Sequence, residues 1–107
     1  MSDEVHYSPE ARANLHALQE YLRDEAGPVV AARYMERLTK YCRSLGGPLV
    51  TGHARDDLYP GLLTRTFEKK RVIAFLVIDR EVHIVAVHGT AQEWERKIRE
   101  NPPQLPE

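Results

Sequence analysis

The sequence predicts an α+β domain in which an antiparallel helical hairpin covers a sheet built around a three-stranded antiparallel meander. Residues 72–78 form an almost unbroken apolar run rich in β-branched and aromatic side chains, which is typical of a strand covered on both faces. After a polar break, residues 82–87 resume this pattern, so the two runs predict a hairpin at the centre of the sheet. Two stretches with helical spacing precede them and can cover one face of that sheet.

The N-terminal part of the chain is expected to form one strand and two helices. Residues 5–7 alternate in polarity and predict a short strand at the edge of the sheet. Ser8 can cap a helix that starts at Pro9. A second helix can start at Pro28, directly after Gly27, and this short connection makes the two helices antiparallel. Apolar residues recur at helical spacing in both segments, first Ala11, Leu15, Leu18 and Leu22, then Ala31, Tyr34, Leu38, Tyr41 and Leu45 before a stop at Gly46-Gly47-Pro48.

The strand that begins the meander, and the turns on either side of it, follow the helices. Residues 49–58 lack either periodicity and are expected to be a loop. Tyr59-Pro60-Gly61 predicts a turn into a strand over residues 62–68. A polar turn at Glu68-Lys69-Lys70 then leads into the two central strands.

The end of the chain predicts a short last helix. Thr90 and Glu93 have the spacing of a capping box, in which each side chain bonds to the backbone N–H of the other residue. Trp94 and Ile98 lie one turn apart on the expected helix, so both can face the sheet.

Length and composition fit one folded domain. The 107 residues can bury one core without a disulfide, and we expect a single domain over residues 1–101 with a mobile tail over 102–107. No apolar run approaches the roughly 20 residues of a membrane span, and the acidic start lacks a signal region, so a cytoplasmic location is expected. The single cysteine, Cys42, is expected to be a buried, inert thiol. The five histidines show no pairing at metal-ligand spacing, so neither a metal site nor a cofactor is expected.

Charge is distributed unevenly along the chain. Residues 31–71 carry nine Lys or Arg against four acids, while both flanking segments are acidic, although the total net charge is −1. Such a basic band can attract an acidic protein segment or nucleic acid, and a solvated surface of mixed charge is the alternative. Its densest part is the cluster of Arg65, Lys69, Lys70 and Arg71.

Taken in order, these motifs resemble those of the RelE/ParE superfamily of bacterial toxins, on the ParE side, from Tyr7 to about Ile98. The resemblance is carried by Ser8-Pro9-Glu10-Ala11-Arg12-Ala13-Asn14-Leu15 with Tyr21, by Arg55-Asp56-Asp57-Leu58-Tyr59-Pro60-Gly61-Leu62, and by the strand end Val87-His88-Gly89. It implies a RelE/ParE-like fold and the role of toxin in a type II toxin-antitoxin module.

The resemblance implies two possible activities. The ParE branch poisons DNA gyrase, takes part in plasmid stabilisation and is neutralised by a ParD-like antitoxin, whereas the RelE branch cleaves ribosome-bound mRNA. We expect an inhibitor that acts by binding rather than an enzyme, in a hetero-oligomer with its antitoxin. Contact with a membrane, or sequence-specific DNA binding by this chain alone, is not expected.

The enzymatic alternative requires an acid, a base and cations around the scissile phosphate. The resemblance implies Lys and Arg on the sheet with a Tyr or His near the C-terminus, which makes Arg65, Arg71 and His88 the candidate catalytic set. However, no Tyr or His follows Gly89. We interpret His88 as a structural residue at a strand end and His83 as a surface residue, so no catalytic set is expected.

Binding residues are predicted on the helices and on the basic cluster. The antitoxin is expected to contact Leu15, Leu18, Leu22, Leu38, Arg65 and Arg71, and the candidates for target binding are Lys69, Lys70, His88 and Trp94. The alternatives are core packing for the leucines, a solvated turn for the basic cluster, and a packed lid for Trp94.

Three departures from the ParE pattern motivate a third hypothesis, an inactive member that only binds its antitoxin. Leu63 follows the Gly-Leu pair where many members have Arg, and Phe75 stands where the strand often ends in Tyr. The common His-Gly-Ala-Arg run is replaced by His88-Gly89-Thr90-Ala91.

Overall fold

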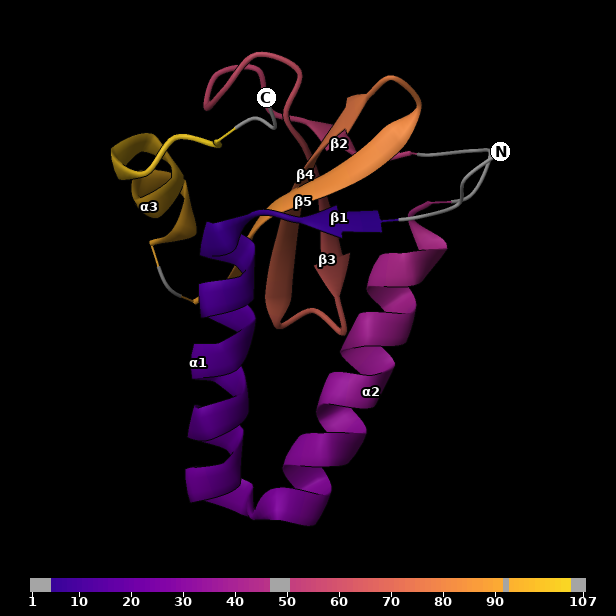
Figure 1. The fold of residues 1–107 in the computed structure, drawn as a ribbon. Helices are drawn as coiled ribbons and strands as arrows, with labels where there is room; N and C mark the ends of the chain where they lie inside the picture. Colours follow the sequence, from indigo (N-terminus) through magenta and orange to yellow (C-terminus); the bar gives the residue numbers. More distant parts are fainter. Residues whose placement is uncertain (1–4, 47–50, 92, 105–107) are drawn as a thin grey trace.

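The computed structural model describes residues 5–46, 51–91 and 93–104 and confirms the predicted α+β class (Figure 1). Its elements are β1 (Val5–Tyr7), α1 (Pro9–Ala26), α2 (Pro28–Ser44), β2 (His53–Ala54), β3 (Leu63–Phe67), β4 (Arg71–Ile78), β5 (Glu81–Gly89) and α3 (Trp94–Glu100). The predicted stop at Gly47-Pro48 and the last three residues of the predicted tail lie outside the described residues. No helix within the described ranges is long and apolar enough to cross a membrane.

The sheet has five strands in the order β1-β5-β4-β3-β2. Strands β3, β4 and β5 form the predicted antiparallel meander, and β1 joins the edge as predicted. Because β1 runs parallel to β5, the sheet is mixed rather than purely antiparallel. The prediction of a loop over 49–58 was wrong at His53–Ala54, which pairs with β3. Two residues that pair through their backbone leave no side-chain periodicity to detect.

The helical hairpin is defined by a cap at the start of α1 and by a glycine between its two helices. Ser8 caps α1 as predicted, since its Oγ accepts a hydrogen bond from the Ala11 N–H at 3.0 Å. The same hydroxyl donates to the Val85 carbonyl at 3.1 Å and so ties the start of α1 to the sheet. Gly27 connects α1 to α2 with a φ of 90°, a conformation that favours glycine. The two helices therefore lie antiparallel and extend together from the sheet (Figure 1).

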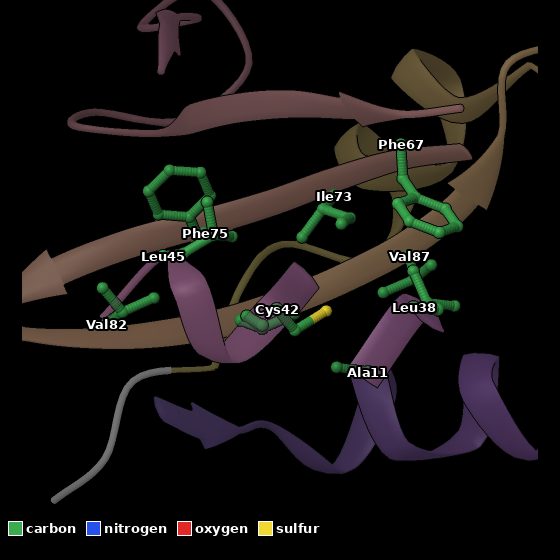
Figure 2. Packing of buried hydrophobic residues seen from close by; sticks show 10 residues of the cluster. Ala11, Leu38, Cys42, Leu45, Phe67, Ile73, Phe75, Val82 and Val87 are labelled. Carbon is green, nitrogen blue, oxygen red and sulfur yellow. The ribbon is translucent and has the colours of Figure 1, made fainter. Parts of the chain in front are cut away.

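The main core lies between the helical hairpin and one face of the sheet. Figure 2 shows side chains from both layers pointing toward one another, with Ala11, Leu38, Cys42 and Leu45 from the helical side and Phe67, Ile73, Phe75, Val82 and Val87 from the strands. Cys42 is a free, fully buried thiol, and burial raises its pKa to about 11. This confirms the expected burial of Cys42, and the raised pKa leaves little thiolate at neutral pH.

A smaller core covers the opposite face of the sheet. Ile98 is buried there and Trp94 packs beside it, so α3 places both predicted residues against the strands. The strand residues of this core are Leu62, Ala74, Leu76, Val85 and Ala86. Strand β4 is thus covered on both faces as predicted over residues 72–76, and it becomes exposed at Val77.

The predicted capping box of α3 was wrong. The helix begins at Trp94 with Glu93 as its N-cap residue, and Glu93 makes no capping hydrogen bond through its side chain. The Thr90 hydroxyl instead donates to the Lys69 carbonyl at 3.2 Å, and the Thr90 N–H donates to the Lys70 carbonyl at 2.9 Å. Thr90 therefore ties the end of β5 to the β3–β4 turn.

Candidate functional site

The four leucines predicted to bind a partner differ in their accessibility. Leu15, Leu18 and Leu22 are half-buried on α1, so part of each side chain is available to a partner. Leu38 is fully buried in the main core, and its predicted role as a binding residue was wrong. The reason is geometric, since α2 needs an apolar side chain at this position to pack against both α1 and the sheet.

The two predicted arginines of the sheet lie beneath α2. Arg65 Nε donates to the Tyr41 hydroxyl at 3.2 Å, and the guanidinium carbon lies 5.9 Å from the centre of the Tyr41 ring. The guanidinium carbon of Arg71 lies 6.0 Å from the centre of the Tyr34 ring. Both side chains are half-buried and lie on the face of the sheet that the helical hairpin covers. The aromatic rings of α2 thus position both cations.

His88 lies on the other face of the sheet. It pairs directly with Val72, which follows Arg71 in β4, and successive strand residues point to opposite faces. Arg65 pairs with the next residue, Ile73, and therefore shares the face of Arg71. The structure consequently does not bring Arg65, Arg71 and His88 together, although all three come from neighbouring strands.

The pKa of His88 is lowered, first by burial and then by the nearby positive charge of Lys97, while Glu10 opposes the shift. Protonation of His88 is thus less favourable in the folded protein than in the unfolded chain, where the side chain binds a proton below a pH of about 6.5. We expect His88 to stabilise the fold fully above this pH, and this contribution to be lost as the pH falls through the lower pKa of the folded state. Urea unfolding at pH 7 and pH 5 tests this, because His88→Gln should lose less stability over that interval than the wild type does. An equal loss in both proteins would contradict the assignment.

A cleft of about 590 Å³ lies between α1 and the adjoining ends of β4 and β5, and we call it the α1 cleft. Its apolar wall includes Leu18 and Tyr21, and the opposite wall includes Lys70 and Arg71. Tyr21 is 57% exposed although it is a large aromatic residue. The cleft therefore brings together Leu18 and Arg71, which were predicted to contact the antitoxin, and Lys70, which was predicted to contact the target. Lys69 lies beside it in the β3–β4 turn and is exposed.

A second cleft of about 600 Å³ includes Arg65 and Trp94. Trp94 is half-buried, and the guanidinium carbon of Arg55 lies 5.2 Å from the centre of its ring. Arg55 also bonds to Asp57 at 2.8 Å and to Glu95 at 2.5 Å, and its hydrogen bond to Asp57 lowers the pKa of that carboxyl. Trp94 thus packs against the smaller core, and its role in target binding stays a prediction. The network around Arg55 was not predicted, because its partner Glu95 lies 40 positions away on α3.

Three further polar side chains meet at the edge of the sheet. His6 pairs with His83 across β1 and β5, and their rings stack with centres 4.7 Å apart. The Nε2 of His6 also contacts the carboxylate of Glu81. These residues were not predicted as a site, because the sequence separates His6 from the other two by more than seventy positions. Spacing along the chain cannot reveal a pair that forms through parallel strand pairing.

Comparisons with known proteins agree with this fold. The family model described as the ParE toxin of the type II toxin-antitoxin system parDE matches residues 5–94. A chain in the solved structure of the chromosomal ParDE TA system from P. aeruginosa is similar with a TM-score of 0.70 and 22% identity, over 82% of this chain and 98% of that chain. The latter likeness shows a shared fold, and no curated protein matches. Because the family model spans most of its length, the chain belongs to the family of ParE toxins of type II toxin-antitoxin systems.

Proposed function

We propose that this protein inhibits DNA gyrase by binding to it, without chemistry of its own, and that a ParD-like antitoxin neutralises it in a hetero-oligomer. Its membership of the ParE family supports this target and this partner. The observation that favours binding over RNA cleavage is the position of His88. Its ring lies on the opposite face of the sheet from Arg65 and Arg71, so these three groups cannot surround one phosphate.

The α1 cleft is the surface that we propose for the antitoxin. Its apolar wall can accept the anchors of an amphipathic helix or an extended segment, and Leu15 and Leu22 can extend the contact along α1. Its basic wall can pair with acidic side chains of the same segment, since Lys70 is exposed and Arg71 lies next to it. A partner of this kind combines apolar anchors with negative charge.

The target is proposed to contact the exposed basic turn beside this cleft. Lys69 and Lys70 are both exposed in the β3–β4 turn. Because the antitoxin cleft includes Lys70, an antitoxin bound there would compete with the target for the same cation. Neutralisation would then follow from occupation of the surface alone.

Two assays on the purified protein test the proposal. Incubation with gyrase and plasmid should stop supercoiling and accumulate linear DNA, and the ParD-like protein encoded beside the toxin gene should prevent this. Incubation with translating ribosomes should leave the mRNA intact. Codon-dependent cleavage that disappears in His88→Ala would instead establish the ribonuclease alternative. If induced expression does not slow bacterial growth, the inactive alternative holds.

A further inference from the structure

The edge of the sheet opposite the basic turn carries two histidines and a carboxylate on one face. His6 and His83 are paired residues of β1 and β5, and Glu81 precedes His83 by two positions, so strand alternation places Glu81 on the same face. His6 lies between Val5 and Tyr7, which both pack against the main core on the other face. All three polar side chains therefore project away from the helical hairpin.

The geometry of these side chains suits one small cation. One ligand atom from each residue, an imidazole nitrogen or a carboxylate oxygen, lies within 4.8 Å of the other two. Two ligands of a tetrahedral zinc ion are about 3.3 Å apart, because each lies about 2.0–2.1 Å from the metal. The most distant of these atoms would thus approach one another by up to about 1.5 Å, while His6 and Glu81 would move slightly apart, to surround one ion. The two imidazole rings stack with an angle of 18° between their planes, so at least one ring must tilt for both nitrogen lone pairs to point at one ion.

We propose that His6, Glu81 and His83 form a binding site for a divalent transition metal, with Zn²⁺ as the best fit. Two imidazoles and one carboxylate are a known zinc ligand set, whereas Ca²⁺ and Mg²⁺ prefer oxygen ligands. The ion would replace the contact between His6 Nε2 and the Glu81 carboxylate, with the imidazole neutral and its one N–H proton on Nδ1. The side chains of His6 and Glu81 are each 40% exposed, which leaves a path for the ion and room for a water ligand.

The consequence for the fold is a link between β1 and the rest of the sheet. β1 has only three residues and lies at the edge, and it leads directly into α1. An ion that binds the folded but not the unfolded chain stabilises the folded state by mass action. Occupation of this site would hold the start of the helical hairpin against β5.

The test is Zn²⁺ binding by the untagged protein, measured by calorimetry and by thermal unfolding with and without ZnCl₂ after chelator treatment. We expect one Zn²⁺ per chain and a higher Tm in its presence. His83→Ala should weaken binding by at least about tenfold and abolish the rise in Tm, and His6→Ala should do the same. Substitution of Co²⁺ should give the visible absorption of a tetrahedral site.

His83→Ala also separates the proposal from a simple ion pair. This variant keeps both His6 and Glu81, so a role limited to their contact would leave the effect of zinc unchanged. His16→Ala and His53→Ala are matched controls, since both histidines are exposed and lie elsewhere, on α1 and β2. The proposal is overturned if the wild type binds no Zn²⁺, if binding survives in His83→Ala, or if binding disappears in either control.

Discussion

Replacing Phe75 by Ala should destabilise the protein by about 3–5 kcal/mol. Phe75 is fully buried at the centre of β4, between Leu63 of β3 and Ile84 of β5, and its side chain belongs to the main core (Figure 2). The substitution removes the whole ring and leaves a cavity that its close-packed neighbours can fill only in part. A domain of this size has a total stability of about 5–15 kcal/mol, so a large fraction would be lost.

Val77 offers a control on the same strand. It lies two residues from Phe75, points to the same side and is 42% exposed. Val77→Ala should therefore change the free energy of unfolding by only about 0.5 kcal/mol. Urea unfolding of both variants at one pH measures the difference. Comparable losses in the two variants would show that Phe75 does not have the central place in the core described above.

Most of the fold could be predicted because its signals are local. Ser8, Pro9 and Gly27 mark the ends of α1 by their own backbone and capping chemistry, and the structure places all three as predicted. The meander could be predicted equally well from the sequence, because its strands are consecutive and its turns are short. The prediction of a capping box failed because the Thr90 hydroxyl bonds instead to the Lys69 carbonyl in the β3–β4 turn, and no local sequence pattern reveals this contact.

The candidate site was less predictable because it depends on which face each side chain occupies. Arg71 and His88 were placed in one phosphate site, yet a difference of one position in the register puts them on opposite faces of the sheet. The partner of Arg55 on α3 and the pairing of His6 with His83 also arise only from tertiary structure. Residue types thus indicated which side chains could bind a partner, and strand pairing decided which of them could act together.

Tyr21→Ala should weaken binding of the ParD-like antitoxin by about 30-fold or more, which corresponds to about 2 kcal/mol. Tyr21 lines the α1 cleft beside Leu18 and is 57% exposed, so the isolated protein gains little from its ring. An antitoxin segment in the cleft would bury that ring, and buried aromatic residues supply much of the energy of such interfaces. The free energy of unfolding of the toxin alone should change by less than about 0.5 kcal/mol.

Val30→Ala distinguishes this site from general hydrophobic attraction. Val30 is 52% exposed in the first turn of α2 and does not line the α1 cleft, so its truncation should leave antitoxin affinity nearly unchanged. Calorimetric titration of both variants with the antitoxin, together with urea unfolding of each variant alone, separates binding from stability. If Val30→Ala weakens binding and Tyr21→Ala does not, the antitoxin lies on the outer surface of the helical hairpin. Loss of binding in Tyr21→Ala alone, with stability retained, places it in the cleft that also holds Lys70, where it would block the basic turn.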